Sequence, residues 1–351
     1  MDASTNQTAQ EYGLSQYVNH GDPYNATAHN GTHTFSLAFD PVMDKAISGI
    51  SVVILFITMV SLGCTMELSK IKAHIMRPKG VAIALVAQFG IMPLSAFALA
   101  KILQMGPIEA VTVLICGCCP GGNLSNIFAL ALQGDMNLSI VMTTCSTVMA
   151  LGMMPLLLYL YCQGFPNIEN AVPYAGISIA LVLTLVPCAV GIAINHWAPR
   201  YASIVTKVGL SLLLIASVAI GIMSGITVGG AVWVLLSPKM MVTASMMPLM
   251  GFLLGYFLSA VLRLNAKCRR TIAMETGCQN IQLCSTILKV AFPLEVIGPL
   301  FLFPLLYIMF QIIEALFLII LFRCYQRLKP ASEGKTVYLA VDGVVEEVKV
   351  P

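Results

Sequence analysis

Long apolar stretches recur along most of the chain, and short polar connections separate them. The stretches lie near residues 44–64, 79–103, 108–132, 137–163, 173–195, 205–225, 237–262, 271–292 and 297–322. Each is long enough for a helix that crosses about 30 Å of hydrocarbon. A membrane β-barrel would instead need segments of about ten residues with alternating polarity, whereas these runs are continuous. The pattern therefore predicts an all-α polytopic membrane protein with nine transmembrane helices.

The composition indicates a chain whose solvent is mostly lipid. Of its 351 residues, 58% are hydrophobic and only 10% are charged, whereas soluble globular proteins carry about 25% charged residues. Most of the 11 cysteines fall inside the apolar stretches, which favours small buried side chains over disulfides. A zinc site within residues 116–119 is an alternative, but no histidine lies near it in the sequence to complete the ligand set.

The two ends of the chain are polar. The first 43 residues are rich in Asn, Thr and His and lack the basic and apolar regions of a signal peptide. We interpret residues 1–43 as an extracellular disordered tail, glycosylated at Asn6, Asn25 and Asn30, each of which begins an Asn-X-Thr sequon. Chance occurrence of this short pattern is the alternative. Residues 323–351 are charged, and we interpret them as a solvated cytoplasmic tail.

The basic residues are distributed unevenly about the predicted helices. If nine helices alternate, the connections 65–78, 133–136, 196–204 and 263–270 share a side of the membrane with the C-terminal tail. Fifteen of the 19 Lys and Arg residues lie on that side or at its helix ends, and basic residues favour the cytosol. We therefore expect a multi-pass protein of the plasma membrane with an extracellular N-terminus and a cytoplasmic C-terminus.

Three short strings recur in the same order in two parts of the chain. The strings at 90–94, 126–127 and 154–157 resemble those at 245–249, 280–281 and 303–306, at offsets of 155, 154 and 149 residues. Each pair is five helices apart, so the two copies would cross the membrane with opposite polarity. Such an inverted repeat is typical of secondary transporters. A Met- and Pro-rich chain can also produce similar strings by chance.

Two of the predicted helices contain residues that interrupt a helix near the centre of the apolar stretch. Pro120, Gly121 and Gly122 interrupt the third helix, and Gly277, flanked by polar side chains, interrupts the eighth. Unwound backbone is tolerated at membrane depth only where protein or a watery cavity satisfies its polar groups. Interrupted helices at corresponding positions of two repeats therefore predict a binding site.

Glu275 is the acidic residue that most needs an explanation. It follows Arg269 by six residues, about 9 Å along a helix, and should therefore lie within hydrocarbon, where a carboxylate needs a cation. Gln279 and Gln282 share its helix face at i+4 and i+7, which makes an oxygen-rich stripe. An ion pair with Arg269 or Arg270 is the alternative.

Further oxygen-bearing side chains occur in other predicted helices. Ser139 and Thr143 are one turn apart in the fourth helix, and Gln88 lies one turn before a break that Pro93 predicts in the second. Hard cations prefer several oxygen ligands, so these groups are candidate cation ligands. Hydroxyls that only pack helices together are the alternative for Ser139 and Thr143.

Four other polar residues in the apolar stretches receive less specific interpretations. Gln311 and Glu314 share a face of the ninth helix without a nearby break, and we interpret them as packing or cavity-lining residues. Glu109 and Lys289 are expected to extend to a membrane interface, as long charged side chains do.

Several strings resemble the sodium/bile acid cotransporter family over residues 44–325. They are Gly63–Glu67, Gly90–Pro93, Cys119–Asn126, Gly134–Ser139 and Glu275–Asn280, of which residues 123–126 and Cys278 resemble the liver type more than the ileal type. The resemblance implies a core domain with two broken crossing helices, formed by residues 79–163 (helices 2–4) and 237–322 (helices 7–9). It implies a panel domain formed by residues 44–64 (helix 1) and 173–225 (helices 5 and 6).

The same resemblance implies sodium-coupled import of conjugated bile acids such as taurocholate by alternating access, with two Na⁺ per bile acid. One sodium ion is implied at Ser125, Asn126, Ser139, Thr143 and Glu275. A second is implied at Gln88, Glu275, Thr276, Cys278 and Gln279. The bile acid is implied to lie between core and panel, near Asn123, Asn126 and Asn280.

Other functions agree less well with the residues. Steroid sulfates or other organic anions are an alternative as the principal substrate. A helical receptor would normally have seven spans and would not explain paired breaks within an inverted repeat. An intramembrane enzyme would need a nucleophile and its base, or a metal cluster, and the membrane-depth positions offer no convincing His partner. We therefore predict a transporter and not an enzyme.

Overall fold

The computed structural model describes residues 53–54, 56–65, 79–165, 172–227, 236–292, 297–328, 336–341 and 344–349. The predicted extracellular tail and its three sequons lie outside these residues. A helix occupies residues 56–64. It is followed by α4 (Lys79–Val86), η2 (Ala87–Ile91), α5 (Met92–Ile102), α6 (Pro107–Cys118), α7 (Asn123–Ala131) and α8 (Met136–Cys162). The remaining elements are α9 (Tyr174–Trp197), α10 (Pro199–Thr227), α12 (Pro238–Val261), α13 (Ala266–Gly277), α14 (Ile281–Ala291), η4 (Gly298–Leu302), α16 (Phe303–Leu328), β1 (Thr336–Val341) and β2 (Val344–Lys349).

Five of the described helical segments are long and apolar enough to cross a membrane. They are Lys79–Ile102, Met136–Cys162, Tyr174–Trp197, Pro238–Val261 and Gly298–Leu328. The predicted third and eighth spans are each divided into two helices of 9 to 12 residues, too short to cross hydrocarbon alone. The described part of the chain is thus a helical membrane protein, and the five uninterrupted candidates agree with five of the predicted spans.

Pro93 does not break its helix, contrary to the prediction. Instead, residues Ala87–Ile91 form one π-helical turn, after which α5 continues to Ile102. Proline has no N–H to donate to the carbonyl one turn back, so the hydrogen-bond register is free to widen before it. Gln88 lies in this π-turn and is only 1% exposed. Such turns are frequent at functional sites.

Local capping explains where several helices begin. Asp135 accepts a hydrogen bond from the backbone N–H of Leu138 at the start of α8. Glu109 accepts one from the N–H of Gly106 at 2.9 Å and so caps α6. The expectation that Glu109 extends to a membrane interface stays a prediction, and the structure adds that its carboxylate caps its own helix. A carboxylate in the first turn also complements the helix dipole.

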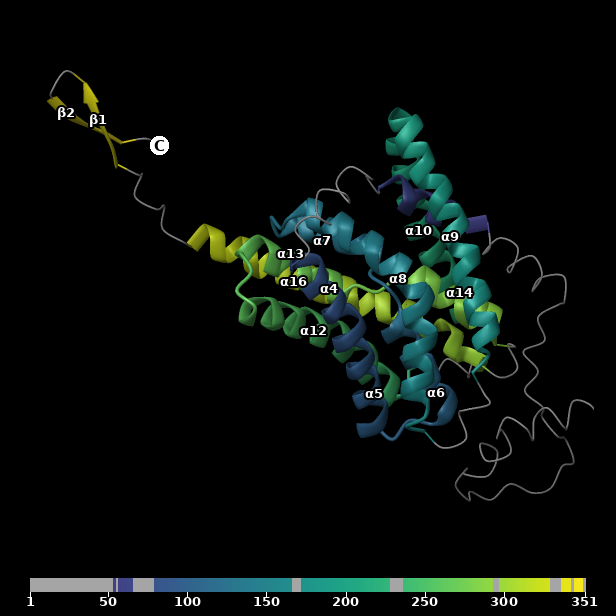
Figure 1. Cartoon of the computed structure of the whole chain (residues 1–351). Helices are drawn as coiled ribbons and strands as arrows, with labels where there is room; N and C mark the ends of the chain where they lie inside the picture. Colours follow the sequence, from purple (N-terminus) through teal and green to yellow (C-terminus); the bar gives the residue numbers. More distant parts are fainter. Residues whose placement is uncertain are drawn as a thin grey trace, which may run out of the picture.

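The helices pack closely where small residues meet. Helix α12 contacts α5, α13 and α16, and α12, α13 and α16 run alongside one another in Figure 1. A Cβ added to Gly251 of α12 would lie 2.6 Å from the Cα of Gly277 in α13. A Cβ added to Gly63 would lie 2.9 Å from the Cα of Gly191 in α9. Small residues let helix backbones approach in lipid, where apolar burial does not drive association.

The outer faces of the long helices are apolar. Ile179, Val182 and Leu183 on α9 are exposed, as are Phe317 and Ile320 on α16. Water would penalise such continuous apolar faces, whereas lipid tails do not. The exposed apolar surface therefore agrees with a membrane environment.

The C-terminal segment contains more structure than the predicted solvated tail. Helix α16 continues to Leu328, six residues beyond the predicted end of the ninth span. Strands β1 and β2 form an antiparallel hairpin in which Thr336 pairs with Lys349. The hairpin is drawn apart from the helices in Figure 1. The all-α prediction thus holds for the described helical body. The hairpin is an addition, and its strands contain Val, Tyr and Leu residues, which favour strands.

Candidate functional site

The two interrupted helices are joined at their breaks. Between α6 and α7, and between α13 and α14, the backbone leaves the helical conformation for a few residues. Gly122 donates its N–H to the carbonyl of Cys278 at 3.0 Å, and Asn280 donates its N–H to the carbonyl of Pro120 at 2.9 Å. Each break thus satisfies polar backbone groups of the other, which membrane depth requires.

Glycine is needed in this crossing because the two backbones nearly touch. Gly121 and Gln279 form an isolated antiparallel β-bridge. A Cβ added to Gly122 would lie 2.6 Å from the carbonyl oxygen of Gln279, and a Cβ added to Gly121 would collide with the carboxylate of Glu275. The predicted helix breaks at residues 120–122 and at Gly277 therefore come together at one place.

The carboxylate of Glu275 is at this crossing. Its side chain is 1% exposed. Ser125 donates its hydroxyl to Oε2 at 2.5 Å, and Thr143 donates its hydroxyl to Oε1 at 2.8 Å. These are hydroxyl donors from α7 and α8, so three helices contribute to one buried acid. Hydrogen bonds to a carboxylate are stronger than those between neutral groups.

The alternative ion pair between Glu275 and a neighbouring arginine is absent among the described residues. Arg269 donates from Nε to the carbonyl of Leu264 at 2.6 Å. Arg270 donates from Nη2 to the carbonyl of Gln133 at 2.9 Å. Both guanidinium groups therefore bond to carbonyls near the start of α13, and the carboxylate has no cationic side chain beside it in the described part of the chain.

The remaining residues of the first implied sodium site lie next to this carboxylate. Ser139 donates its hydroxyl to Oδ1 of Asn126 at 2.6 Å. The Thr143 hydroxyl also lies 3.1 Å from the carbonyl oxygen of Ser139. The packing interpretation of the two hydroxyls is thus incomplete, because both also bond to polar side chains. The structure brings all five residues of this set together in one hydrogen-bonded group.

A second group of oxygen atoms surrounds Gln88. Its Nε2 donates to the carbonyl of Cys119 at 2.9 Å and to Oε1 of Gln279 at 3.1 Å. Gln279 in turn donates from Nε2 to the carbonyl of Thr276 at 2.9 Å. Cys278 takes part through its backbone carbonyl, which accepts from the opposite break. Glu275 is also implied in the second sodium site. Its side-chain hydrogen bonds, however, are with Ser125 and Thr143 of the first site.

The donor atoms suit a hard monovalent cation. Oε1 of Gln88 is buried and has no hydrogen-bond partner, and leaving such an atom unsatisfied is costly unless a ligand occupies it. The Gln88 side chain lies beside the carbonyl oxygen of Cys119 and Oε1 of Gln279, and oxygens of these types are ligands that hard cations prefer. Among the described residues, no group of three His, Cys, Asp or Glu side chains could hold a metal ion, so the alternative zinc site at residues 116–119 finds no support.

The three asparagines implied for bile acid binding have different environments. Asn280 uses its Oδ1 to accept the N–H of Leu283 at 3.1 Å and so caps α14. Asn123 is the first residue of α7, and its Oδ1 is buried without a hydrogen-bond partner. Asn126 is engaged by Ser139. Two of the three therefore lie at helix N-termini beside the crossing.

Comparison with known proteins identifies the family. Residues 52–236 match the Sodium Bile acid symporter family. The chain belongs to this family. It is 56% identical to the hepatic sodium/bile acid cotransporter of Homo sapiens over 321 residues, which cover 89% of this chain and 92% of the relative. The rat hepatic sodium/bile acid cotransporter is 55% identical, covering 87% of this chain and 86% of the relative.

A relative named for another tissue is less similar. The human ileal sodium/bile acid cotransporter is 41% identical over 275 residues and covers 78% of each chain. The greater identity to the hepatic proteins agrees with the strings that resemble the liver type. The family consists of transporters, which confirms the prediction of a transporter and not an enzyme.

Two residues that contact the second break were not predicted as site residues. Gln311 of α16 accepts the backbone N–H of Gln279 with its Oε1 at 3.1 Å and is fully buried. Tyr307, one turn earlier, donates its hydroxyl to the carbonyl of Gly277 at 2.9 Å. Gln311 is buried as the packing interpretation expects, and it also bonds the backbone of the second break, which that interpretation did not include. The spacing of Tyr307 and Gln311 in the sequence places them on one face of a helix. The sequence does not show that this face contacts the second break.

Proposed function

We propose that the chain is a secondary active symporter that imports conjugated bile acids together with sodium. The observation that carries this proposal is Glu275, a buried carboxylate without a described cationic neighbour, bonded by Ser125 and Thr143 where two broken helices cross. A carboxylate in that position calls for a mobile cation. Membership of the sodium/bile acid symporter family supports sodium as that cation.

Two sodium sites are proposed at the crossing. The first comprises Ser125, Asn126, Ser139, Thr143 and Glu275, and the second comprises Gln88, Glu275, Thr276, Cys278 and Gln279. The orphaned Oε1 of Gln88 supports the second site, because a cation would satisfy it. We add Gln311 as a positioning residue, since it holds the backbone of Gln279 and does not itself belong to either ligand set.

The helix ends at the crossing favour opposite charges. Helices α6 and α13 end there, and helices α7 and α14 begin there. The C-terminal ends carry partial negative charge and favour cations, while the N-terminal ends favour anions. Asn123 and Asn280 lie at the two N-terminal ends, which supports their proposed role, with Asn126, in binding the anionic substrate. Sodium would lower the local negative charge before the bile anion approaches, which couples the two ligands.

Alternating access is proposed to move a core domain, residues 79–163 and 237–322, against a panel domain, residues 44–64 and 173–225. Close packing within the panel supports this division. Gly63 lies against Gly191 of α9, and Gly209 of α10 lies against Ser61. The proposed nine helices and inverted repeat are consistent with the pairing of the two divided spans at one crossing.

Two sodium ions with one monovalent bile anion would carry one net positive charge inward. An inside-negative membrane potential favours that movement by about 2.3 kcal/mol per charge per 100 mV. We propose a plasma-membrane protein with residues 1–43 outside and the segment from residue 323 inside. The excess of basic residues on the proposed cytosolic side supports this orientation.

Steroid sulfates and other organic anions are the second candidate substrates, because they share one anionic group and an apolar body with bile acids. The test is uptake of radiolabelled taurocholate by cells that express the chain, with choline replacing sodium in parallel, and with a steroid sulfate tested in the same cells. Sodium-dependent taurocholate uptake is expected. Uptake that is equal in choline would refute sodium coupling, and sodium-dependent uptake of the steroid sulfate alone would replace the substrate.

A further inference from the structure

A cavity of about 730 Å³ lies between α12, α13 and α16, on residues that the two proposed sodium sites do not use. Leu253 and Tyr325 at its rim are 55% and 64% exposed. Both belong to long apolar helices whose outer faces suit lipid contact. The cavity is therefore accessible sideways from a bilayer.

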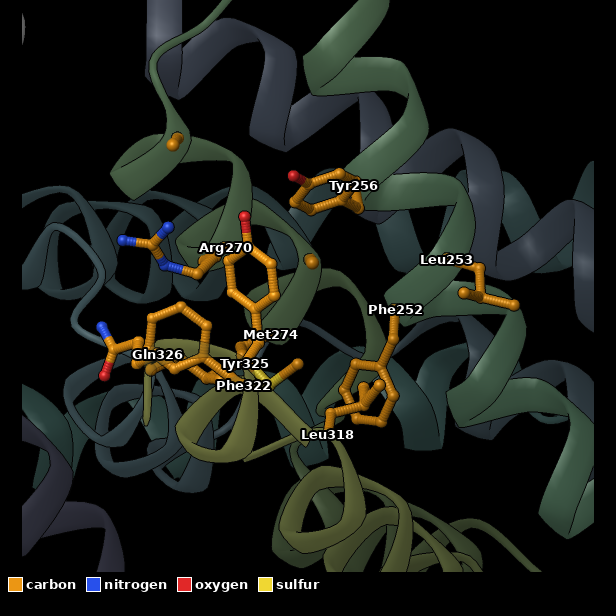
Figure 2. A pocket seen from close by; sticks show the side chains of 12 residues that line it. Phe252, Leu253, Tyr256, Arg270, Met274, Leu318, Phe322, Tyr325 and Gln326 are labelled. Carbon is orange, nitrogen blue, oxygen red and sulfur yellow. The ribbon is translucent and has the colours of Figure 1, made fainter. Parts of the chain in front are cut away.

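The cavity has one polar end and one apolar end. Figure 2 shows the guanidinium of Arg270 and the amide of Gln326 on one side, and Phe252, Leu253 and Leu318 on the other. None of the described residues that line it is acidic. The lining is thus complementary to a molecule with an anionic group at one end and a hydrocarbon body.

Arg270 is held in place but is not fully satisfied. Its Nη2 donates to the carbonyl of Gln133 at 2.9 Å, and its guanidinium carbon lies 4.8 Å from the ring centroid of Phe322. Its Nε is buried and has no hydrogen-bond partner. The guanidinium therefore has no anionic partner among the described residues, and phosphate oxygens accept well from guanidinium groups.

Arg270 lies near one end of its helix, with a second basic residue close to the cavity. It lies in the second turn of α13, and Arg323, near the end of α16, donates to the carbonyl of Ala131. Ala131 directly precedes Leu132, which lines the cavity. Basic side chains near helix ends meet lipid headgroups, and anionic lipids are attracted to such clusters.

We propose that this cavity binds an anionic phospholipid from the bilayer. The phosphate accepts from the guanidinium of Arg270, and one acyl chain lies along Phe252 and Leu318 while the rest of the lipid stays in the membrane. A sterol would leave the guanidinium without an anionic partner. The proposal does not depend on transport, because lipid binding is measured on the purified protein.

The test uses full-length purified protein in detergent, titrated with dioleoylphosphatidylserine or dioleoylphosphatidylcholine and observed by native mass spectrometry. The wild type is expected to bind phosphatidylserine in preference. Arg270→Gln should weaken that binding about tenfold, which is the loss of a charge-assisted hydrogen bond. Arg327→Gln is the matched control, because Arg327 is exposed near the end of the same bundle and does not line the cavity.

A second variant keeps the test informative if Arg270→Gln folds poorly. Leu253→Trp adds bulk at the exposed apolar end and should also reduce phosphatidylserine binding while leaving Arg270 in place. Equal affinity for the two lipids, or equal losses in Arg270→Gln and Arg327→Gln, would overturn the proposal. Displacement of the lipid by taurocholate at comparable concentration would also overturn it, because the cavity would then be a site for the transported anion.

Discussion

Replacing Gly122 with alanine should separate the two broken helices. The added Cβ would lie 2.6 Å from the carbonyl oxygen of Gln279 and 3.2 Å from the Cα of Asn280, whereas an ordinary contact begins at 3.4 Å. Both obstacles are backbone atoms, so no side chain can turn away. The φ of Gly122 is −106°, which alanine adopts freely, and the effect is therefore steric and not conformational.

The magnitude follows from the bonds that the separation breaks. The hydrogen bonds from Gly122 to Cys278 and from Asn280 to Pro120 each contribute about 1 kcal/mol net. Losing both costs about 2 kcal/mol, within the range of overpacking in a dense core. We expect initial sodium-dependent taurocholate uptake to fall more than tenfold and the thermal unfolding midpoint in detergent to fall by about 4 °C or more.

Gly152→Ala is the matched control for this experiment. Gly152 lies within α8, and a Cβ there would meet no atom within 4 Å. The same chemical change should therefore leave uptake and the unfolding midpoint close to those of the wild type. If Gly122→Ala also retained wild-type uptake and stability, the close approach of the two breaks would not be required for function, and the reasoning would be refuted.

Three further predictions concern the charge of Glu275, the contact of Gln311 with the second break, and the extracellular location of the N-terminal tail. Glu275→Gln keeps the shape of the side chain but removes its charge. Sodium-dependent taurocholate uptake should therefore disappear, although the variant reaches the cell surface normally. Uptake like that of the wild type would exclude the proposed sodium sites. Gln311→Leu leaves the backbone N–H of Gln279 unpaired, at a cost of about 1–3 kcal/mol. The sodium concentration that gives half-maximal uptake should therefore rise about tenfold. An unchanged sodium dependence would show that Gln311 does not position Gln279. Glycosidase treatment should shift the protein on gels unless all three sequon asparagines are replaced by Gln; an absence of any shift would contradict an extracellular glycosylated tail.

Much of the helical framework was predictable because it depends on local chemistry. Apolar stretches of 20 or more residues predict membrane helices whatever their neighbours are. Pro120 and the two glycines after it interrupt a helix through their own backbone properties. The predicted break at Pro93 was wrong. Residues 87–91 form a π-helical turn before the proline, and the helix continues after it. That choice depends on surrounding helices, which local rules do not include.

The composition of the candidate site was less accessible than its location. Glu275 stands out in the sequence because a carboxylate in hydrocarbon is costly. Its partner Ser125 is 150 residues away, and no periodicity connects the two, so only the family resemblance placed them in one ligand set. The contact of Gln311 with Gln279 was not predicted for the same reason, since it crosses from one helix to another. Side-chain partners across helices are decided by packing, to which the whole chain contributes.

The sequence alone determined that this protein spans a membrane, that two of its helices are interrupted, and that one acid is buried among polar residues, because hydropathy, Pro and Gly conformation and charge desolvation act residue by residue. Only the tertiary structure decided that the two interruptions bond to each other, that hydroxyls of α7 and α8 bond to the carboxylate, and that Arg270 lines a cavity between α12, α13 and α16. These features depend on how separate helices are placed, and that placement is the outcome of packing the complete chain.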